Sequence, residues 1–277
     1  MKKITLGIVF LVLVIGAYVV GKENSSFEPD LSIFKDTMVE LTWLEVKDAA
    51  KNNAIVLFPI AVVEEHGPHL DLSPDIYITC LNCRMIKREL KKKGINCIIA
   101  PPYYWGINVS TGIYPGSFTV REETFKAVLS DGIRCLKNWG FTKVFCVNFH
   151  GDSVHSQVLD TSLREIRNNL GIDVYNIHQL NAAIENPPAF SPNRQGKYFP
   201  DYHAGADETA TIWAFYPDKV RMDVAEKLEP QDRFNYPLGY VGDPASFKLE
   251  KGAGESLKVL AKLSALEVEA FLKQKDE

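Results

Sequence analysis

Apolar stretches alternate with mixed polar and apolar stretches along the chain, and this pattern predicts buried strands separated by helices. The clearest strand covers residues 54–60, where β-branched and aromatic side chains follow one another without a charged residue. A continuous run of this kind is typical of a strand that is buried on both faces of a sheet. Similar runs predict three more strands, at Asn96–Ala100, Lys143–Phe149 and Ile172–Ile177.

Helices are expected between and after these strands. Ser73 and Pro74 are strong start signals for a long helix that ends near Lys93, because Ser is favoured at the N-cap and Pro at the first helical position. The regular alternation of strands and helices predicts βαβ units, and therefore an α/β fold with a mostly parallel sheet. The other expected helices lie within Leu41–Asn53, at Arg121–Trp139, at 153–169, from the His203 region through Phe215, and from about Glu255 to Lys273.

Polar side chains directly follow two of the predicted strands. The first strand leads into Glu64–His69, with Asp75 in the first turn of the next helix, and the third strand ends at His150 and Asp152. The carboxyl ends of parallel strands meet at one edge of a sheet, so these groups are expected to lie close together. Burying them unpaired is costly, whereas a divalent metal binds carboxylate oxygen and neutral imidazole nitrogen together. The sequence therefore predicts a metal site at this edge.

Two other segments supply candidate site residues. His203 precedes a predicted helix and Glu208 lies about one turn inside it, where the free N–H groups of a helix start favour anions. The aromatic and glycine-rich loop at Pro101–Thr119 follows a strand, and loops in this position often contact substrate. Tyr104 and Trp105 are therefore candidates to line a substrate pocket, and simple packing beneath the loop is the alternative.

Composition narrows the range of functions. The 277-residue chain has a net charge of −4, which offers no basic surface, so we expect no nucleic-acid partner. Its five cysteines form no disulfide framework for a chain of this size. Cys80 and Cys83 fall inside a predicted helix, and the sequence has no second pair of this spacing to complete a zinc site.

The N-terminus is expected to be a targeting segment. Lys2 and Lys3 precede an apolar run from Ile4 to Val20, which is close to the roughly 17 residues needed to span a bilayer. An uncleaved membrane anchor is favoured, because no clear small-residue cleavage site follows, and a cleaved secretory signal remains open. We expect a segment at 1–22, a linker at 23–40 and a folded domain at 41–277, which would lie outside the cytoplasm, anchored or secreted.

Four blocks of the sequence resemble the creatininase (creatinine amidohydrolase) family. They occur in the family's order from about residue 40 onward, and together they are highly specific. A fifth segment, Tyr114-Pro115-Gly116-Ser117, resembles the family's Phe-Pro-Gly-Thr. The four blocks are Glu64-Glu65-His66-Gly67-Pro68-His69-Leu70 with Asp75, Asn148-Phe149-His150-Gly151-Asp152, His203-Ala204-Gly205 with Glu208-Thr209, and Gly239-Tyr240-Val241-Gly242-Asp243-Pro244 with Glu250-Lys251-Gly252.

The resemblance implies a three-layer αβα sandwich, two divalent metal ions per chain (Zn, Mn or Fe) and a homo-oligomer, often a hexamer. In this arrangement the leaving nitrogen needs a proton, and His203 is the best candidate to carry it, because the pKa of a free imidazole lies near neutral. Glu65 would point to the opposite face if the strand continued, and it is assigned a supporting role. Creatininase proper has Glu where this chain has Asp152, so Glu208 is an alternative source of that ligand. The implied ligands are Glu64, Asp75 and His150 for one metal and His66, Asp75 and Asp152 for the other.

The function implied by this resemblance is hydrolysis of a non-peptide amide, of the lactam or formamide type, in a small-molecule substrate. A hydroxide activated by the two metals would attack the amide carbonyl. Two other classes remain open. One is a two-metal hydrolase that acts on a peptide or a phosphoester, although the turns that carry the ligands hold no Arg or Lys for a phosphate. The other is a membrane-tethered, non-catalytic binding protein that keeps the fold.

Overall fold

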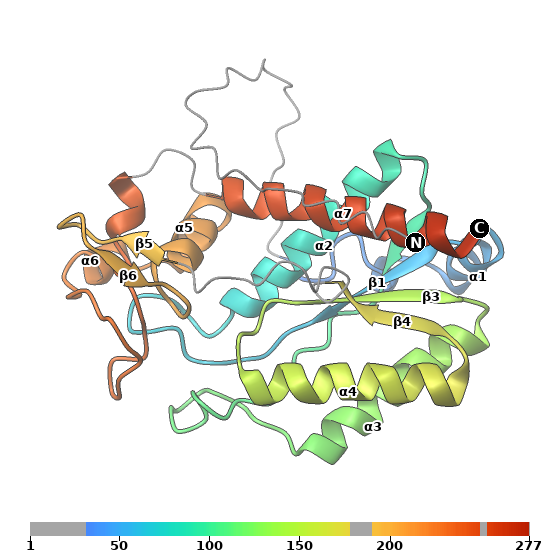
Figure 1. Cartoon of the computed structure of the whole chain (residues 1–277), viewed down its shortest axis with the longest axis horizontal. Helices are drawn as coiled ribbons and strands as arrows, with labels where there is room; N and C mark the ends of the chain where they lie inside the picture. Colours follow the sequence, from blue (N-terminus) through green and yellow to red (C-terminus); the bar gives the residue numbers. More distant parts are fainter. Residues whose placement is uncertain (1–31, 178–189, 250–253, 277) are drawn as a thin grey trace, which may run out of the picture.

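The structure, a computed structural model, describes residues 32–177, 190–249 and 254–276 (Figure 1). The expected targeting segment at 1–22 lies outside the described residues. So do His178, just beyond the fourth predicted strand, and residues 250–252 of the fourth family block. Within the described ranges, no helix has both the length and the apolar character needed to cross a bilayer. Attachment to a membrane through residues 1–22 therefore stays a prediction.

Four parallel strands form the central sheet, in the order β2-β1-β3-β4. Each strand lies within the range expected from the sequence, and the parallel pairing confirms the predicted α/β fold. Leu57, in the middle of the sheet, pairs with Ile99 on one side and with Phe145 on the other. The strands are β1 (Ile55–Ile60), β2 (Cys97–Ile99), β3 (Lys143–Asn148) and β4 (Asp173–Asn176).

Helices cover both faces of this sheet and make the three-layer sandwich that was expected (Figure 1). Successive residues of β1 point to opposite faces, so Leu57 joins the hydrophobic cluster on one face whereas Val56 and Phe58 join the cluster on the other. Burial on both faces explains why the sequence of this strand is apolar throughout. The covering helices are α2 (Pro74–Lys92) and α7 (Glu255–Asp276) on one face, and α3 (Glu122–Asn138) and α4 (Ser153–Leu170) on the other.

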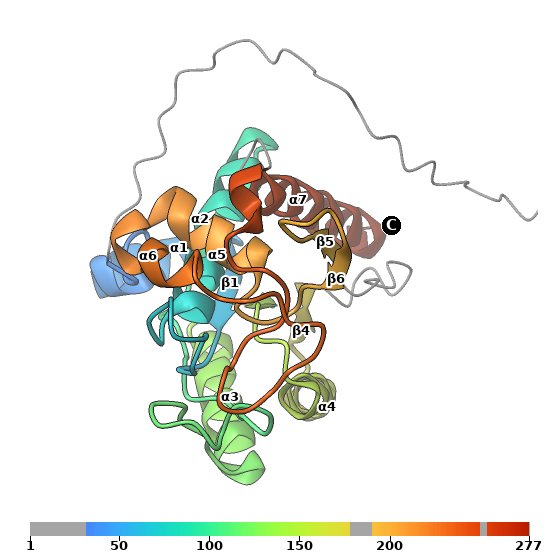
Figure 2. The same cartoon turned by 90° about the vertical axis from the view of Figure 1, so that its left-hand side faces the viewer.

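Smaller elements gather beyond the carboxyl ends of the strands (Figure 2). Prolines and asparagines predicted a loop across 181–201, but residues 190–200 form a two-stranded antiparallel hairpin. Both of its strands are edge strands, which tolerate proline. The elements in this region are β5 (Phe190–Pro192), β6 (Tyr198–Pro200), α5 (Ala206–Phe215), η3 (Pro217–Lys219), α6 (Met222–Ala225) and η4 (Ser246–Leu249).

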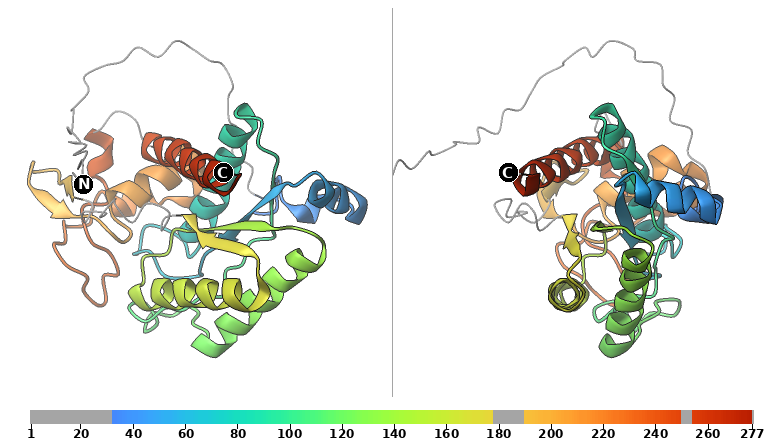
Figure 3. Two further views of the ribbon diagram at one scale, coloured as in Figure 1. Left: turned by 45° about the vertical axis from the view of Figure 1, so that its right-hand side comes forward. Right: turned by 90° about the vertical axis from the view of Figure 1, so that its right-hand side faces the viewer.

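The N-terminal helices lie at the other end of the molecule (Figure 3). The short helix η1 (Met38–Glu40) precedes α1 (Trp43–Lys51), which lies within the range expected for a helix, Leu41–Asn53. The Thr42 side chain accepts a hydrogen bond from the Glu45 N–H, and the Glu45 carboxylate accepts one from the Thr42 N–H. This capping box satisfies two N–H groups at the helix start. Because they lie at this end of the molecule, the N-terminal helices are far from the sheet edge where metal ligands were expected (Figure 3).

We expect Leu57→Ala to lower the free energy of unfolding by about 2–5 kcal/mol, because it opens a cavity beside a fully buried central strand. Leu44→Ala is the matched control: it makes the same change on α1, where the side chain is 53% exposed, and it should cost less than about 1 kcal/mol. Urea unfolding followed by circular dichroism measures both values. Equal losses in the two variants would contradict the assignment of the core.

Candidate metal centre

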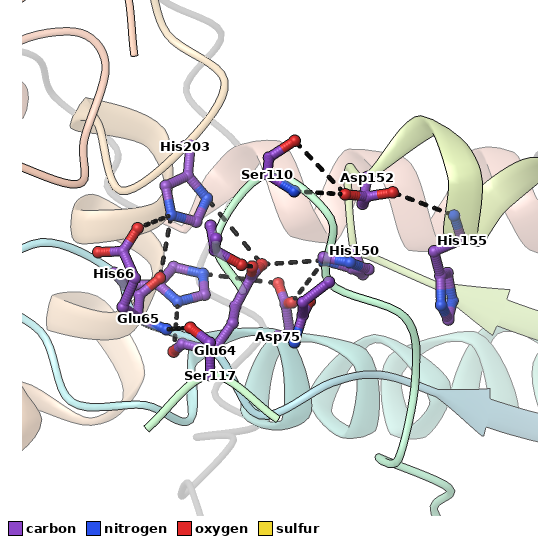
Figure 4. Close-up of polar contacts among 12 residues, drawn as sticks. Glu64, Glu65, His66, Asp75, Ser110, Ser117, His150, Asp152, His155 and His203 are labelled. Carbon is purple, nitrogen blue, oxygen red and sulfur yellow. Dashed lines mark hydrogen bonds and ion pairs between the residues drawn. The ribbon is translucent and has the colours of Figure 1, made fainter. Parts of the chain in front are cut away.

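Acidic and imidazole side chains from separate segments meet beyond the carboxyl ends of β1 and β3 (Figure 4). Glu64 and His66 lie in the loop after β1, and His150 comes two residues after β3. Asp75 is the second residue of α2, and Glu208 lies in the first turn of α5. The strand ends and helix starts of the parallel sheet therefore bring together residues that are far apart in the sequence, as the motif pattern predicted.

Glu64, Asp75 and His150 form one group with the spacing of metal ligands. His150 Nδ1 lies 2.9 Å from Glu64 Oε1 and 3.2 Å from Asp75 Oδ2. The other ring nitrogen, Nε2, lies 3.0 Å from the carbonyl oxygen of Ile107. A carbonyl can only accept, so Nε2 carries a proton and Nδ1 faces the carboxylates. Metal-binding histidines commonly donate the proton of their second nitrogen in this way.

His66, Asp75 and Glu208 form a second group. His66 Nδ1 lies 3.2 Å from the carbonyl oxygen of Glu64 and donates to it. His66 Nε2 is left 3.6 Å from Asp75 Oδ1 and 3.7 Å from Glu208 Oε2. This buried nitrogen makes no hydrogen bond to any described residue. A buried polar atom without a partner is costly, and a cation placed between it and the two carboxylates removes that cost. The residues present therefore fit a divalent metal.

The pKa values of the clustered side chains also indicate that this site favours positive charge. Burial favours a neutral imidazole, yet the carboxylates of Glu208 and Asp75 raise the pKa of His66 to about 10. Burial also lowers the pKa of His150, but Asp75 and Glu64 raise it to about 11. Burial would also raise the pKa of Asp75, but the two imidazoles hold it well below its usual range. The carboxylates thus require compensating positive charge, which protonated imidazoles or metal ions can supply.

Asp152, one of the two residues expected as candidates to complete the second group, lies outside the ligand groups of the described residues (Figure 4). Its Oδ1 accepts the N–H groups of Val154 and His155, at 2.9 and 3.1 Å, which makes it the N-cap of α4. Its Oδ2 accepts the N–H groups of Val109 and Ser110, also at 2.9 and 3.1 Å. Both carboxylate oxygens of Asp152 thus accept hydrogen bonds from the backbone. The second ligand group takes a carboxylate oxygen from Glu208, in the first turn of α5, instead.

His203 lies next to His66, with 4.7 Å between the ring centres. Its Nε2 lies 3.0 Å from the carbonyl oxygen of Glu65 and 3.2 Å from Glu65 Oε1, so this nitrogen is the donor. Its Nδ1 lies 4.0 Å from Glu64 Oε1, and Glu64, His66 and His203 also have the spacing of a ligand group. Because β1 ends at Ile60, the strand does not continue as far as Glu65, and Glu65 contacts His203 rather than the opposite face of the sheet.

The long loop after β2 supplies contacts that the sequence analysis missed. Thr111 Oγ1 donates a hydrogen bond to Glu64 Oε2, and the Ile107 carbonyl accepts the proton of His150. These contacts orient one carboxylate and one imidazole of the first group. The available signal was the short polar stretch 108–111 inside an otherwise aromatic and apolar loop.

Two further buried histidines support the site without joining the ligand groups of the described residues. His155 Nδ1 accepts the Ile107 N–H at 3.2 Å, and its ring packs against that of His150 with 4.9 Å between centres. His69 Nε2 lies 2.9 Å from Thr209 Oγ1, which connects the loop after β1 to α5. Burial and neighbouring imidazoles lower the pKa of each of these two rings to about 3, so both stay neutral.

The two aromatic residues expected to line a substrate pocket make apolar packing contacts with neighbouring side chains. Tyr104 is half-buried and packs against a small apolar cluster around Ile76. Trp105 is 45% exposed and packs edge-on against Phe118, with 5.5 Å between ring centres. These contacts match the packing alternative, and a role of Tyr104 and Trp105 in substrate binding stays a prediction.

A parallel α/β sandwich whose strand ends carry buried carboxylates and imidazoles is typical of a metal-dependent hydrolase. The chain belongs to the creatininase family, because the family model described as creatinine amidohydrolase matches residues 39–266. This is the family that the sequence motifs indicated, and the chain is accordingly a hydrolase.

Individual relatives agree with this assignment. The chain is 24% identical over 196 residues to a creatinine amidohydrolase from Pseudomonas putida, covering 66% of this chain and 73% of the relative. It is 25% identical over 214 residues to a mycofactocin precursor peptide peptidase from Mycobacterium ulcerans (strain Agy99), covering 71% of this chain and 78% of the relative. A solved structure described as "Creatininase Mn" shares the fold, with a TM-score of 0.62 at 20% identity over 86% of this chain and 98% of that one.

Asp152→Ala should lower the free energy of unfolding by about 1–3 kcal/mol at pH 7, because it removes a helix cap and a buried acceptor. Burial opposes ionisation, but the surrounding N–H groups hold the pKa of Asp152 below its usual value. Its contribution is therefore complete above the unfolded-state pKa of about 4 and is lost as the pH falls through the lower folded-state value.

Urea unfolding at pH 7 and at acidic pH measures this difference. Asp131→Ala is the control, because that carboxylate lies on the surface of α3 with a side chain that is 69% exposed. The same loss at every pH, or no loss at pH 7, would contradict the capping role of Asp152.

Proposed function

We propose that the chain holds two divalent metal ions, one on Glu64, Asp75 and His150 and the other on His66, Asp75 and Glu208. Asp75 would serve both ions. The observation that carries this proposal is the buried Nε2 of His66, which faces two carboxylates and makes no hydrogen bond within the described part of the chain. Mixed oxygen and imidazole ligands suit Zn, Mn or Fe. Manganese is named for a related creatininase structure, which supports it as one candidate.

Bound divalent ions would supply a water acidic enough to act as hydroxide near neutral pH and would polarise the amide carbonyl. The chain's own part in the reaction is proton transfer by His203. The Glu65 carbonyl and carboxylate fix the proton on His203 Nε2, so Nδ1 is the nitrogen that faces the cluster. Although burial opposes it, the hydrogen bond to Glu65 raises the pKa of His203, which helps the ring to take up a second proton. The proton on Nδ1 can then pass to the leaving nitrogen as the C–N bond breaks.

The bond that we propose is cleaved is a non-peptide amide, of the lactam or formamide type, in a small molecule. The family match and the similarity to a creatinine amidohydrolase support this class. The similarity to a mycofactocin precursor peptide peptidase favours a peptide amide as the second candidate. Assays of lactams, formamides and short peptides with one metal-loaded preparation would separate the two classes.

The placement of the protein in the cell is also a proposal. Attachment through residues 1–22 and a domain outside the cytoplasm rest on the basic and apolar pattern of that segment. Assembly into a homo-oligomer, of the hexameric kind, rests on the resemblance to the family.

Elemental analysis of the purified full-length chain tests the metal centre. We expect close to two ions per chain, and about one or fewer in His66→Ala, His150→Ala and Glu208→Gln, because each change removes a ligand from one group. Asp152→Ala is the matched control and should keep its metal, since its carboxylate faces backbone N–H groups. An unaltered chain that holds no metal, and takes up none from added Zn or Mn, would contradict the proposal.

His203→Ala should lower kcat for an amide substrate by about 10²- to 10⁴-fold, the usual contribution of a general acid or base. Metal content should stay unchanged, because neither proposed ion depends on this ring. Steady-state kinetics on a substrate found in the assays, with elemental analysis of the same sample, measures both. Loss of metal together with activity would instead make His203 a ligand in the group with Glu64 and His66.

A further inference from the structure

A groove with mostly apolar walls lies between the N-terminal helices and α3, and it encloses about 960 Å³. Met38 of η1 and Phe58 of β1 line its buried part. Its rim carries large apolar side chains that solvent reaches, among them Trp43, which is 70% exposed, and Trp139, which is 53% exposed. An exposed apolar surface of this kind marks contact with a protein or a membrane. The groove is therefore a candidate docking surface.

The chain enters the fold beside this groove. The Lys87 ammonium donates a hydrogen bond of 3.0 Å to the Asp36 carbonyl, and Thr37 forms an isolated parallel bridge with β2. The next residue, Met38, already lines the groove. Only residues 21–31 separate the N-terminal apolar run from the described chain, and a stretch of this length reaches at most about 40 Å. The apolar run therefore keeps the groove close to whatever surrounds that run.

We propose that the groove and its tryptophan rim dock on the surface of a phospholipid bilayer. The inference rests on the proposed attachment through residues 1–22, which brings this part of the fold next to the lipid. Tryptophan is favoured at the boundary between headgroups and acyl chains, because its ring is apolar and its N–H is polar. Lys47 Nζ lies 5.7 Å from the centre of the Trp43 ring, so an ammonium group is placed to meet lipid phosphates at the same level.

This docking mode separates the bilayer from the metal centre. The N-terminal helices lie at the opposite end of the molecule from the sheet edge that carries the candidate ligands (Figure 3). A domain that rests on the bilayer through the groove therefore turns the metal centre toward the aqueous side, where dissolved substrate reaches it. The groove would thus hold the domain in one orientation, which the segment at residues 1–22 alone does not define.

Quenching of tryptophan fluorescence by lipids with brominated acyl chains tests this inference. The full-length chain is reconstituted into vesicles of phosphatidylcholine and phosphatidylglycerol, where bromine quenches only tryptophans that contact the lipid. The chain has four tryptophans and none within residues 1–31, so the signal comes from the folded domain. Because two of the four line the groove, we expect a loss of about half of the fluorescence relative to unbrominated vesicles.

Variants assign this loss to the groove. The loss should fall to about a third in Trp43→Phe and in Trp139→Phe, because one of the three remaining tryptophans then contacts the lipid. Trp213→Phe is the matched control, since it removes a tryptophan that is 41% exposed on α5, away from the groove. In this variant two of the three remaining tryptophans contact the lipid, so the loss should rise to about two-thirds.

Flotation of the same samples on a density gradient separates two kinds of failure. A chain that floats with the vesicles but keeps its full fluorescence would overturn docking through the groove and leave the attachment standing. A second copy of the chain covering the groove would give this result. Quenching that neither groove variant changes would overturn the docking in the same way. A full-length chain that does not float with the vesicles would contradict the proposed attachment, and the inference that rests on it would fall as well.

Discussion

Compensation of negative charge at one edge of a parallel sheet is the constraint on which the rest of this structure depends. Glu64, Asp75 and Glu208 converge at a site where the first two are buried and the third is partly buried, and like charges cannot stay together there without positive partners. The fold supplies part of the compensation, since Asp75 and Glu208 each lie in the first turn of a helix, at its positive end. Imidazoles, or metal ions held between them and the carboxylates, supply the rest.

The surroundings of each histidine decide its role more than its position in a motif does. His66 and His150 each donate one ring proton to a backbone carbonyl and turn the other nitrogen toward carboxylates. His69 and His155 lie as deeply in the protein but face a hydroxyl and a backbone N–H, so burial keeps them neutral. The first pair is suited to cations, whereas the second pair fixes the loops around the first.

The sequence predicted those features that depend on local pattern. The apolar run of β1 and the Ser-Pro helix start placed Glu64, His66 and Asp75 at one edge, and the strand before His150 placed that residue beside them. The pattern left open whether Asp152 or Glu208 completes the second group, because that outcome depends on side-chain reach. Asp152 is one methylene shorter than Glu, and four backbone N–H groups surround its carboxylate.

Contacts between distant segments were also beyond the reach of the sequence pattern. The orientation of Glu65 depends on where β1 ends, which a run of apolar residues does not define. The packing of Phe234 against His203 joins two loops that no periodicity connects. The hairpin of β5 and β6 forms despite its prolines because an edge strand needs fewer backbone donors than a central one.

The position of Asp75 has a consequence for the proposed pair of ions. One of its oxygens faces His66 and the other faces His150, so a single carboxylate belongs to both ligand groups. Two ions that share a ligand cannot bind independently. If binding of the first ion changes the affinity for the second by some factor, binding of the second ion changes the affinity for the first by the same factor. The reason is that the coupling free energy is a property of the pair. Occupancy of this centre would therefore follow the supply of metal as a linked equilibrium, not as two separate binding events.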